Sequence, residues 1–189
     1  MAKDERFRDL PAIETERLLL RTLEMEDAED IFEWVSDPQV TTYLFWRAHQ
    51  SIEDSRDFIA WVTIDDFACW GVVPTENSKV VGNCFLHNVN FEHKRAEIAF
   101  NIARKYWGRG YATETAQAVL RFGFEHWGLN RIEGTCMVEN HASARVMEKV
   151  GMNLEGVLRR YVYVRGQFHD MKLYSILRDE VVQDSQNSG

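Results

Sequence analysis

The sequence is poor in cysteine and proline and has no long apolar run. Its three cysteines, Cys69, Cys84 and Cys136, lie far apart along 189 residues, and none belongs to a CxxC pair. This spacing indicates neither a zinc site nor a disulfide framework, so we expect small buried thiols, no metal and a cytoplasmic location. No stretch approaches the roughly 20 apolar residues of a membrane span, and the charged first residues are unlike a secretory signal. We therefore expect no membrane partner.

Basic residues are also scarce relative to acidic ones. Lys and Arg number 22 against 30 Asp and Glu, which gives a formal net charge of −8. A protein that binds nucleic-acid backbones in general needs the opposite balance, so we expect no nucleic-acid partner. The hydrophobic share of 45% and the charged share of 28% are those of an ordinary globular chain. Cationic partners remain compatible with this charge.

The chain is expected to form one domain. Neither a Gly/Ser linker nor an internal repeat interrupts it, and its length is near the upper limit of a single ordinary domain. We predict a polar N-terminal arm over residues 1–14, a folded domain over 15–178 and a polar C-terminal tail over 179–189. Within the tail, residues 183–189 are expected to fray.

The spacing of apolar residues predicts both strands and helices. Strands are expected at 17–21, 68–73, 79–89, 95–103, 131–138, 161–164 and 168–177, and helices at 25–36, from Ser51 onward, at 111–127 and at 140–150. This order predicts an α/β fold with a mixed central sheet of about seven strands and helices on both faces. The crossover from 95–103 through the helix at 111–127 to 131–138 is expected to be the parallel unit, and ligands bind at such crossovers.

The loop inside that crossover carries the clearest binding signal. Its sequence is Lys105-Tyr106-Trp107-Gly108-Arg109-Gly110-Tyr111-Ala112-Thr113. Two glycines one residue apart let the backbone approach a ligand closely, and the first N–H groups of a helix lack internal partners. A diphosphate fits there, and Lys105 and Arg109 can add positive charge. The loop is neither a Rossmann fingerprint nor a P-loop, and a plain strand-to-helix turn would also explain two glycines.

Several motifs in order resemble the GNAT-type N-acetyltransferases. Lys105–Gly110 is similar to the family's acetyl-CoA loop, Gln/Arg-x-x-Gly-x-Gly/Ala, with Lys in the first place. Asn140-His141-Ala142-Ser143, followed by Glu148-Lys149-Val150-Gly151-Met152, resembles the family's Asn-x-x-Ser/Ala…Glu-Lys-x-Gly-Phe segment. The stretches Arg95–Phe100, Thr15–Arg21 and Gly166–Asp170 look like the RimJ/RimL branch of ribosomal-protein N-acetyltransferases. Together the resemblance covers about residues 14–178, so the expected domain is a GNAT domain.

The resemblance implies a splayed sheet that holds acetyl-CoA. The family's fourth and fifth strands, here 95–103 and 131–138, would separate and admit the pantetheine arm. That arm would pair with the backbone near Ile102, with Asn140 on the other side, while the diphosphate would rest on the glycine loop. The residues implied in cosubstrate binding are Ile102, Lys105, Trp107, Gly108, Arg109, Gly110, Tyr111, Ala112, Thr113, Asn140 and Ser143.

Acetylation of an amine needs a group that removes the amine proton and one that protonates the leaving thiolate. Glu97 is predicted to be the base, directly or through water. It lies in mid-strand, in a sheet that we expect to be covered on both faces, and burial of an unpaired carboxylate there costs free energy. The alternative is a structural pair with a neighbouring Arg or Lys. Ser143 is predicted to be the acid, as in the RimJ/RimL branch, since Met147 replaces the tyrosine of many relatives. The alternative is a first-turn serine that bonds the backbone.

The predicted function is acetyl-CoA-dependent N-acetyl transfer to the α-amine of a protein or peptide. Trp34 and Trp46 flank the exit of the first helix, where the acceptor enters in such enzymes. His87 could contact the substrate, but we expect it to be a structural histidine. Some relatives carry a glutamate base near the position of Val162, where this sequence has no carboxylate. The alternatives are a small-molecule acceptor (polyamine, aminoglycoside or aminoacyl compound) and a non-catalytic acetyl-CoA-binding module. A monomer or a homodimer is compatible with the sequence.

Overall fold

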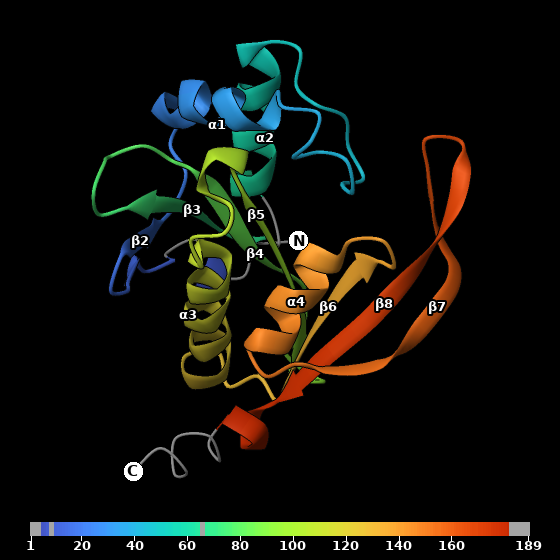
Figure 1. The fold of residues 1–189 in the computed structure, drawn as a ribbon. Coiled ribbons are helices and arrows are strands. Elements are labelled where there is room, and N and C mark those ends of the chain that lie inside the picture. The colour runs from blue at the N-terminus through green and yellow to red at the C-terminus, as the bar shows by residue number, and fades with distance from the viewer. Residues whose placement is uncertain (1–4, 8–9, 65–66, 182–189) are drawn as a thin grey trace.

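The computed structural model describes residues 5–7, 10–64 and 67–181, and Figure 1 shows its fold. Residues 1–4 and 8–9 of the predicted arm and residues 182–189 of the predicted tail lie outside the described part. None of the described helices is both long and apolar enough to cross a bilayer.

Among the described residues, a mixed sheet of eight strands forms the centre of the molecule. The strands are β1 (Ile13–Glu14), β2 (Leu18–Arg21), β3 (Ala68–Pro74), β4 (Gly82–Asn90), β5 (Arg95–Ile102), β6 (Arg131–Met137), β7 (Asn153–Val164) and β8 (Gln167–Leu177). They lie in the order β1-β2-β3-β4-β5-β6-β8-β7, and only β5 and β6 run parallel. The predicted α/β fold and its parallel unit are confirmed. The strand beyond the expected seven is β1, which pairs with β2 from within the predicted arm.

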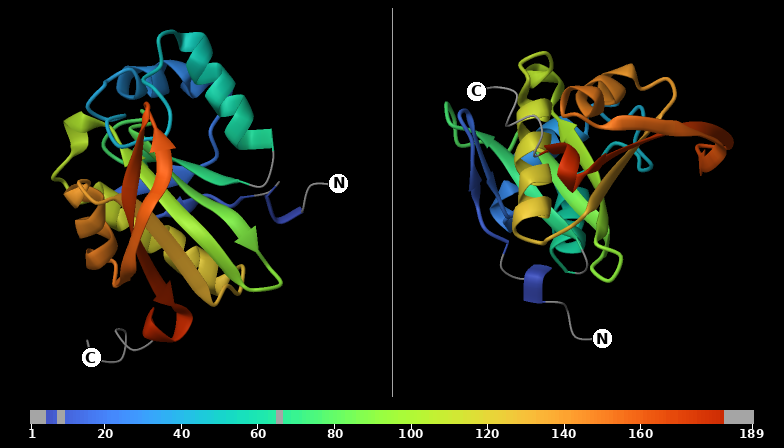
Figure 2. Two further views of the ribbon diagram at one scale, coloured as in Figure 1. Left: turned by 90° about the vertical axis from the view of Figure 1, so that its right-hand side faces the viewer. Right: turned by 90° about the horizontal axis from the view of Figure 1, so that it is seen from below.

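Helices cover both faces of this sheet. They are η1 (Glu5–Phe7), η2 (Met25–Asp27), α1 (Ala28–Val35), α2 (Ile52–Ile64), η3 (Arg104–Tyr106), α3 (Tyr111–Glu125) and α4 (His141–Lys149). Phe58 of α2 packs against Phe85 of β4, with ring centroids 6.3 Å apart. Gly123 of α3 instead faces Leu86, the next residue of β4, whose side chain points to the opposite side. The pairs α1–α2 and α3–α4 therefore lie on opposite faces (Figure 2).

The N-terminal segment contacts the domain through aromatic packing and a hydrogen bond. Phe7 is buried, and its ring centroid lies 5.3 Å from that of Trp127 and 6.0 Å from that of Phe91. The indole Nε1 of Trp70 donates a hydrogen bond to the carbonyl of Pro11 at 3.0 Å. Phe7 and Pro11 of the predicted arm thus contact the folded domain.

The three cysteines are buried and free, as the sequence predicts. Burial raises the pKa of each thiol, well above the ordinary value for Cys69 and to about 11 for Cys136. Such thiols are packing residues, because a protonated and inaccessible sulfur is a poor nucleophile.

The β7–β8 hairpin is longer than the sequence pattern indicates. Strand β7 begins at Asn153, whereas the prediction placed its start at Tyr161. Its pairing with β8 shifts register between Leu158 and Val162, where Arg160 adopts a positive φ of 53°. These irregularities interrupt the alternation of side chains, so the first half of the strand has no clear period of two. The turn itself consists of Arg165 and Gly166, both with positive φ, and β8 starts at Gln167.

Strands β5 and β6 pair over a short length and then part. The pairs are Arg95 with Arg131, Ala96 with Ile132 and Glu97 with Glu133. Beyond Glu97, β5 continues along β4 as far as Ile102, while β6 continues along β8 as far as Met137. The predicted splay is confirmed, and Figure 1 shows the two strands diverging toward the α1–α2 end of the molecule.

Candidate active site at the divergence of β5 and β6

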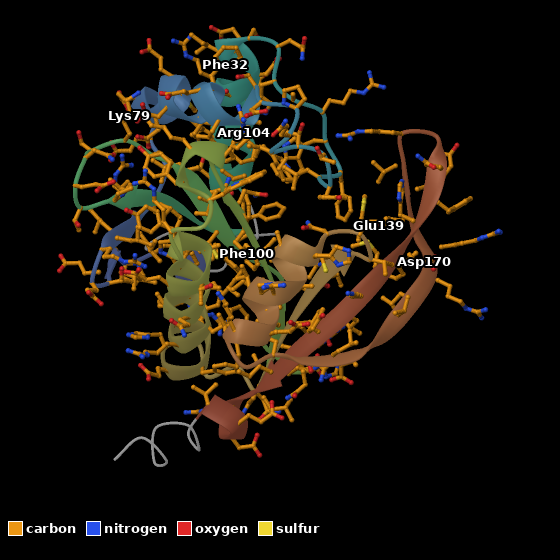
Figure 3. All side chains as sticks on the ribbon, in the orientation of Figure 1. Phe32, Lys79, Phe100, Arg104, Glu139 and Asp170 are labelled. Carbon is orange, nitrogen blue, oxygen red and sulfur yellow. The ribbon has the colours of Figure 1, made fainter. Side chains whose placement is uncertain are left out.

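The divergence leaves one edge of β5 without a neighbouring strand. The N–H of Ala103, just after β5, donates to the carbonyl of Val81 at 2.7 Å, so this residue faces the β4 side. Backbone groups alternate along an antiparallel strand, so Phe100 and Ile102 turn theirs toward the side that β6 leaves. The indole Nε1 of Trp107 engages the carbonyl of Ile102 at 2.6 Å. An extended ligand that carries amides can pair with the remaining groups, above all those of Phe100, which Figure 3 labels.

The loop that follows β5 presents a row of backbone amides. Gly108 and Gly110 have φ values of 76° and 84°, a conformation that favours glycine. Helix α3 starts at Tyr111 without a side-chain cap, and the N–H of Glu114 is the first to bond within it, to the carbonyl of Gly110 at 3.0 Å. Among the described residues, no hydrogen bond engages the N–H groups of residues 108–113. This is the geometry that binds a phosphate at a helix N-terminus.

Cationic side chains surround this loop. The guanidinium of Arg109 lies 5.0 Å from the ring centre of Tyr106, and the ammonium of Lys105 lies 5.9 Å from the same ring. Both side chains are exposed. Arg109 Nη1 also lies 3.3 Å from Oε1 of Glu76, an ion pair that partly offsets its positive charge. The loop therefore offers positive charge to an anionic ligand, with one carboxylate in competition for it.

A contact network holds the loop against the start of β2, and the sequence pattern gave no sign of it. Arg17 donates from Nη1 to the carbonyl of Arg109 at 2.9 Å and forms an ion pair with Glu114 of α3 at 2.6 Å. Glu114 also accepts hydrogen bonds from the Thr15 hydroxyl at 2.7 Å and the Arg17 N–H at 2.9 Å. Burial raises the pKa of Glu114, but these hydrogen bonds outweigh it and hold the pKa below the ordinary value. The Thr15–Arg21 stretch thus positions the amide loop.

Helix α4 begins beside the divergence with Asn140 as its N-cap. The side-chain oxygen of Asn140 accepts a hydrogen bond from the N–H of Ser143 at 3.1 Å. This capping uses the amide oxygen of Asn140 and leaves its NH2 group for other partners. Ser143 is half-buried, and among the described residues its hydroxyl has no hydrogen-bond partner. The role of Ser143 as the acid stays a prediction.

Glu97 lies at the last paired position before the strands separate. It is half-buried rather than fully enclosed, and its Oε1 accepts a hydrogen bond from Asn88 at 3.0 Å. The nearby arginines bind a different carboxylate, since Arg131 and Arg95 approach Glu133 at 2.6 Å and 3.9 Å. Among the described residues Glu97 has no ion-pair partner, in contrast to the structural alternative. It shares a sheet face with Phe85, which α2 covers.

The other residues considered in the sequence, His87, Trp34 and Trp46, pack against neighbouring side chains. His87 is the cross-strand partner of Glu97, and burial lowers its pKa although Glu97 opposes this. Trp46 packs against Phe58 with ring centroids 6.3 Å apart. Trp34 is buried and lines a cavity beside η3 together with Lys79 and Arg104. The two tryptophans thus border the α1–α2 face, but different parts of it.

The tip of the β7–β8 hairpin is hydrogen-bonded to the loop between α1 and α2. Arg165 donates from Nη2 to the carbonyls of Thr41 at 2.8 Å and Trp46 at 3.3 Å, and from Nη1 to the carbonyl of Thr42 at 3.0 Å. Sequence reasoning identified this hairpin but not its contact with a loop more than a hundred residues earlier. One available signal was an arginine at a turn position that favours Asn or Gly.

Together these features define a class of protein. A sheet that opens between two parallel strands, beside a helix N-terminus with unengaged amides, accommodates a long ligand with a diphosphate and an amide-bearing arm. No three His, Cys, Asp or Glu side chains gather as a metal site within residues 5–7, 10–64 and 67–181. The chain has the architecture of an acyl-CoA-dependent transferase.

Comparison with known proteins identifies the family. Residues 17–153 match the model of the acetyltransferase (GNAT) domain. The "uncharacterized N-acetyltransferase YoaA" of Bacillus subtilis is 35% identical over 172 residues, which cover 89% of this chain and 97% of that protein. A solved GNAT acetyltransferase from Bacillus anthracis superposes with a TM-score of 0.83 at 35% identity, over 89% of this chain and 99% of the other. The chain belongs to the GNAT family and is an acetyl-CoA N-acetyltransferase.

More distant relatives have names that specify acceptors. YdaF of Bacillus subtilis, with a provisional name as a ribosomal N-acetyltransferase, is 30% identical over 171 residues, 87% of this chain and 93% of that protein. The spermidine N(1)-acetyltransferase of Vibrio cholerae is 25% identical over 170 residues, 90% of this chain and 98% of that protein. These relatives differ in acceptor, so membership of the family leaves the acceptor open.

Proposed function

We propose that this enzyme transfers the acetyl group of acetyl-CoA to the α-amine of a protein or peptide, as a member of the RimJ/RimL branch. The observation that carries the acetyl-CoA part is the divergence of β5 and β6 beside the unengaged amides of residues 108–113. YdaF supports a protein acceptor, as do the stretches of sequence that resemble the RimJ/RimL branch. The small-amine alternative has its own support in the spermidine N(1)-acetyltransferases among the relatives.

The cosubstrate is proposed to lie along the open edge of β5 and across the amide loop. The N–H groups of Gly108, Arg109, Gly110, Tyr111, Ala112 and Thr113 would hold the diphosphate, with the side chains of Lys105 and Arg109 adding charge. Trp107 would border the diphosphate, while its indole keeps the carbonyl of Ile102 engaged. The N–H of Ile102 and the backbone of Phe100 would then pair with pantetheine, opposite the free NH2 of Asn140. Bound acetyl-CoA supplies an activated acetyl thioester.

Glu97 and Ser143 are proposed to move the protons. Glu97 lies where the strands part and forms no ion pair among the described residues, so its carboxylate can accept a proton from the amine, directly or through water. Ser143 has an unengaged hydroxyl at the start of α4 and can protonate the thiolate as it leaves. Alignment of the two reactants along β5 would supply much of the rate enhancement.

Paired variants test these roles. With Glu97→Gln and Ser143→Ala, we expect unchanged acetyl-CoA affinity by calorimetry and a kcat lowered roughly 10²- to 10⁴-fold for the loss of acid–base catalysis. Turnover like that of the wild type in both variants would remove these two residues from the mechanism.

A parallel acceptor panel tests the proposed acceptor. Peptides with free N-termini, including ribosomal-protein sequences, are compared with the same peptides blocked at the N-terminus and with spermidine, an aminoglycoside and an aminoacyl compound. Acetylation of the free peptides alone supports the proposal, and mass spectrometry locates the acetyl group. If only the small amines are acetylated, the alternative acceptor class is correct. Binding of acetyl-CoA without transfer to any of them would favour a binding module.

A further inference from the structure

The two segments that meet at the hairpin contact contain no acidic residue. One is the α1–α2 loop over 38–50 and the other is the hairpin tip over 156–169. This is unusual in a chain with 30 Asp and Glu residues and a net charge of −8. The two segments carry four arginines, namely Arg47, Arg159, Arg160 and Arg165. A positively charged island therefore lies on an acidic molecule.

A cavity of about 480 Å³ lies between these two segments. Its lining consists of Pro38, Thr41, Arg47, Ala48, Gln50, Arg165 and Gly166, so its ionisable side chains are two arginines. Arg47 is exposed and, among the described residues, has no hydrogen-bond or ion-pair partner. Arg165 uses three N–H bonds on the loop carbonyls, which leaves its Nε–H and one Nη1–H. Both guanidinium groups therefore retain donors for a ligand.

The carboxylates that border the two segments in sequence are already engaged. Asp37 forms an ion pair with Arg104 at 2.6 Å, and Glu155 with Arg131 at 2.8 Å. The remaining three are also bonded: Glu53 pairs with Arg56, Asp54 accepts the N–H groups of Gln50 and Ser51, and Asp170 accepts the N–H of Arg160. Figure 3 labels Asp170 on the hairpin and Arg104, the partner of Asp37, near the α1–α2 end. These acids thus have other partners than the arginines of the cavity.

The backbone of Arg165 has a conformation that is uncommon for a residue with a side chain. Its φ of 50° lies in the left-handed region, which is unfavourable for a residue with a side chain. A hairpin turn of this kind favours Asn or Gly at that position. The arginine side chain compensates by joining the hairpin to the loop, and it brings a guanidinium to the cavity wall.

We propose that the acceptor carries an anionic group, a carboxylate or a phosphate, beside its reactive amine, and that Arg47 and Arg165 bind this group in the cavity. This rests on the proposed function and specifies the acceptor. The cavity lies on the α1–α2 side toward which β5 and β6 open, so an anion held there directs the attached amine toward the divergence. Guanidinium groups bind carboxylates and phosphates through paired N–H donors. A polycation such as spermidine would meet like charges.

Matched acceptors and one matched pair of variants test this inference. The peptides share an N-terminal serine and differ in the next two residues, which are Asp-Glu, Asn-Gln or Lys-Lys, and O-phosphoethanolamine is compared with ethanolamine. The variant Arg47→Gln removes one charge at a side chain that has no partner within the described part of the chain. The control Arg121→Gln removes the same charge from an exposed position on α3. We expect wild-type kcat/KM to favour the anionic member of a pair roughly tenfold, as for one charge-assisted contact.

The variants then assign that preference to the cavity. Arg47→Gln should reduce the preference roughly fivefold or more by raising KM for the anionic acceptor, with acetyl-CoA affinity unchanged, whereas Arg121→Gln should leave it intact. A preference within the peptides assigns a carboxylate, and one for O-phosphoethanolamine assigns a phosphate. Preference for neutral or basic acceptors, or a preference that Arg47→Gln leaves unchanged, overturns the inference.

A binding measurement separates failure of this inference from failure of the proposed function. The same peptides, acetylated at the N-terminus, are titrated into the enzyme saturated with CoA, so that no turnover is needed. Tighter binding of the Asp-Glu peptide, lost in Arg47→Gln, supports the anion site even if no peptide is a substrate. Equal affinities for the three peptides contradict it even if all of them are acetylated.

Discussion

At the scale of single residues, the candidate active site is held by contacts between distant parts of the chain. Arg17 reaches Arg109 and Glu114 on the loop and helix α3, and Arg165 reaches the carbonyls of the α1–α2 loop. Each arginine gives directional N–H donors to carbonyl or carboxylate oxygens, so it fixes the position of a loop that has no side-chain cap of its own. The site's geometry thus depends on residues outside the proposed chemistry.

Glu76 competes with an anionic ligand for Arg109. The variant Glu76→Gln removes a carboxylate 3.3 Å from the guanidinium, and we expect it to tighten acetyl-CoA binding roughly two- to fivefold at low ionic strength. The effect should shrink in high salt because both groups are exposed. Isothermal titration measures it, with Glu92→Gln on the β4–β5 turn as a control of equal charge. Weaker binding in Glu76→Gln would show that Arg109 does not face the ligand.

Glu114 makes the stability of the loop anchor depend on pH. Its pKa is lowered in the folded protein, so its carboxylate stabilises the fold in full above its ordinary value of 4.5, and this contribution is lost as pH falls through the folded pKa. We expect Glu114→Gln to unfold more easily than the wild type by about 1 kcal/mol at pH 7, since one charged partner of Arg17 is lost. The difference should disappear on acidification below the folded pKa.

Urea unfolding followed by tryptophan fluorescence, repeated from pH 7 downward, measures this difference. The control is Glu125→Gln, an exposed residue at the other end of the same helix that forms no ion pair among the described residues. A difference that stays constant with pH would show that the carboxylate is not the source of the stabilisation.

The backbone of the glycine loop could be predicted from the sequence, whereas the roles of the site residues stay predictions. The glycines at 108 and 110 could be placed because positive φ and an uncapped helix start leave a sequence signature. Glu97 and Ser143 were chosen from motif position, and their proposed roles stay predictions. Arg47 and Arg165 could not be identified from the sequence, because their proposed roles depend on which loops meet in space.

At the scale of elements, helix α3 is bounded by two glycines of the same backbone conformation. Gly110 precedes it with φ 84°, and Gly128 follows it with φ 63°. Alanine at either position costs about 1 kcal/mol of stability, because a Cβ is unfavourable in the left-handed region. At Gly110 the new Cβ would also lie 3.3 Å from Nη2 of Arg17, whereas at Gly128 it would meet no atom within 4 Å.

This pair separates stability from ligand binding. We expect Gly110→Ala to weaken acetyl-CoA binding at least tenfold, since the amides of the loop would turn away from a common centre. Gly128→Ala should lose a similar amount of stability but retain the wild-type affinity. Thermal unfolding and titration calorimetry measure the two quantities on each variant. Equal affinities in the two variants would argue against the loop as the diphosphate site.

Most elements could be predicted because their apolar spacing matches the face that they bury. Strand β5 is an example, since Ala96 and Ile98 turn toward α3 and α4 while Glu97 turns toward α2. The start of β7 could not be predicted, because it is an edge strand with an irregular register and exposed apolar side chains such as Leu154 and Val157. Such a strand lacks the one-sided burial that produces a period of two.

At the scale of the whole molecule, the three thiols report on global unfolding. They lie in β3, β4 and β6, on both sides of the divergence, and their protonated form is favoured by burial. We expect no thiol to react with an excess of a disulfide reagent within minutes in the native protein, and three to react in denaturant. Spectrophotometric labelling at rising urea should follow the unfolding transition. One thiol that reacts rapidly without denaturant would show local opening around it.

The overall fold could be predicted because several weak motifs occur in one order and fill one domain. The crossover rules require the parallel pair, and the resemblance places the splay within it. The distribution of charge could not be obtained from composition, because the net value of −8 conceals the positive island formed by two separate segments. Composition averages over the surface, whereas the fold brings particular side chains together.

Strands β5 and β6 are paired through three residue pairs, which is a short contact between the two parts of an eight-stranded sheet. On one side lie β1 to β5, and on the other β6 to β8, held to the rest also by the packing of α3 and α4. If acetyl-CoA pairs with β5 as proposed, the ligand occupies the edge of β5 from which β6 has diverged, as a neighbouring strand would. Amide hydrogen exchange at Phe100 and Ile102 would then slow with rising ligand concentration. The cosubstrate would be a structural member of the sheet as well as the donor in the reaction.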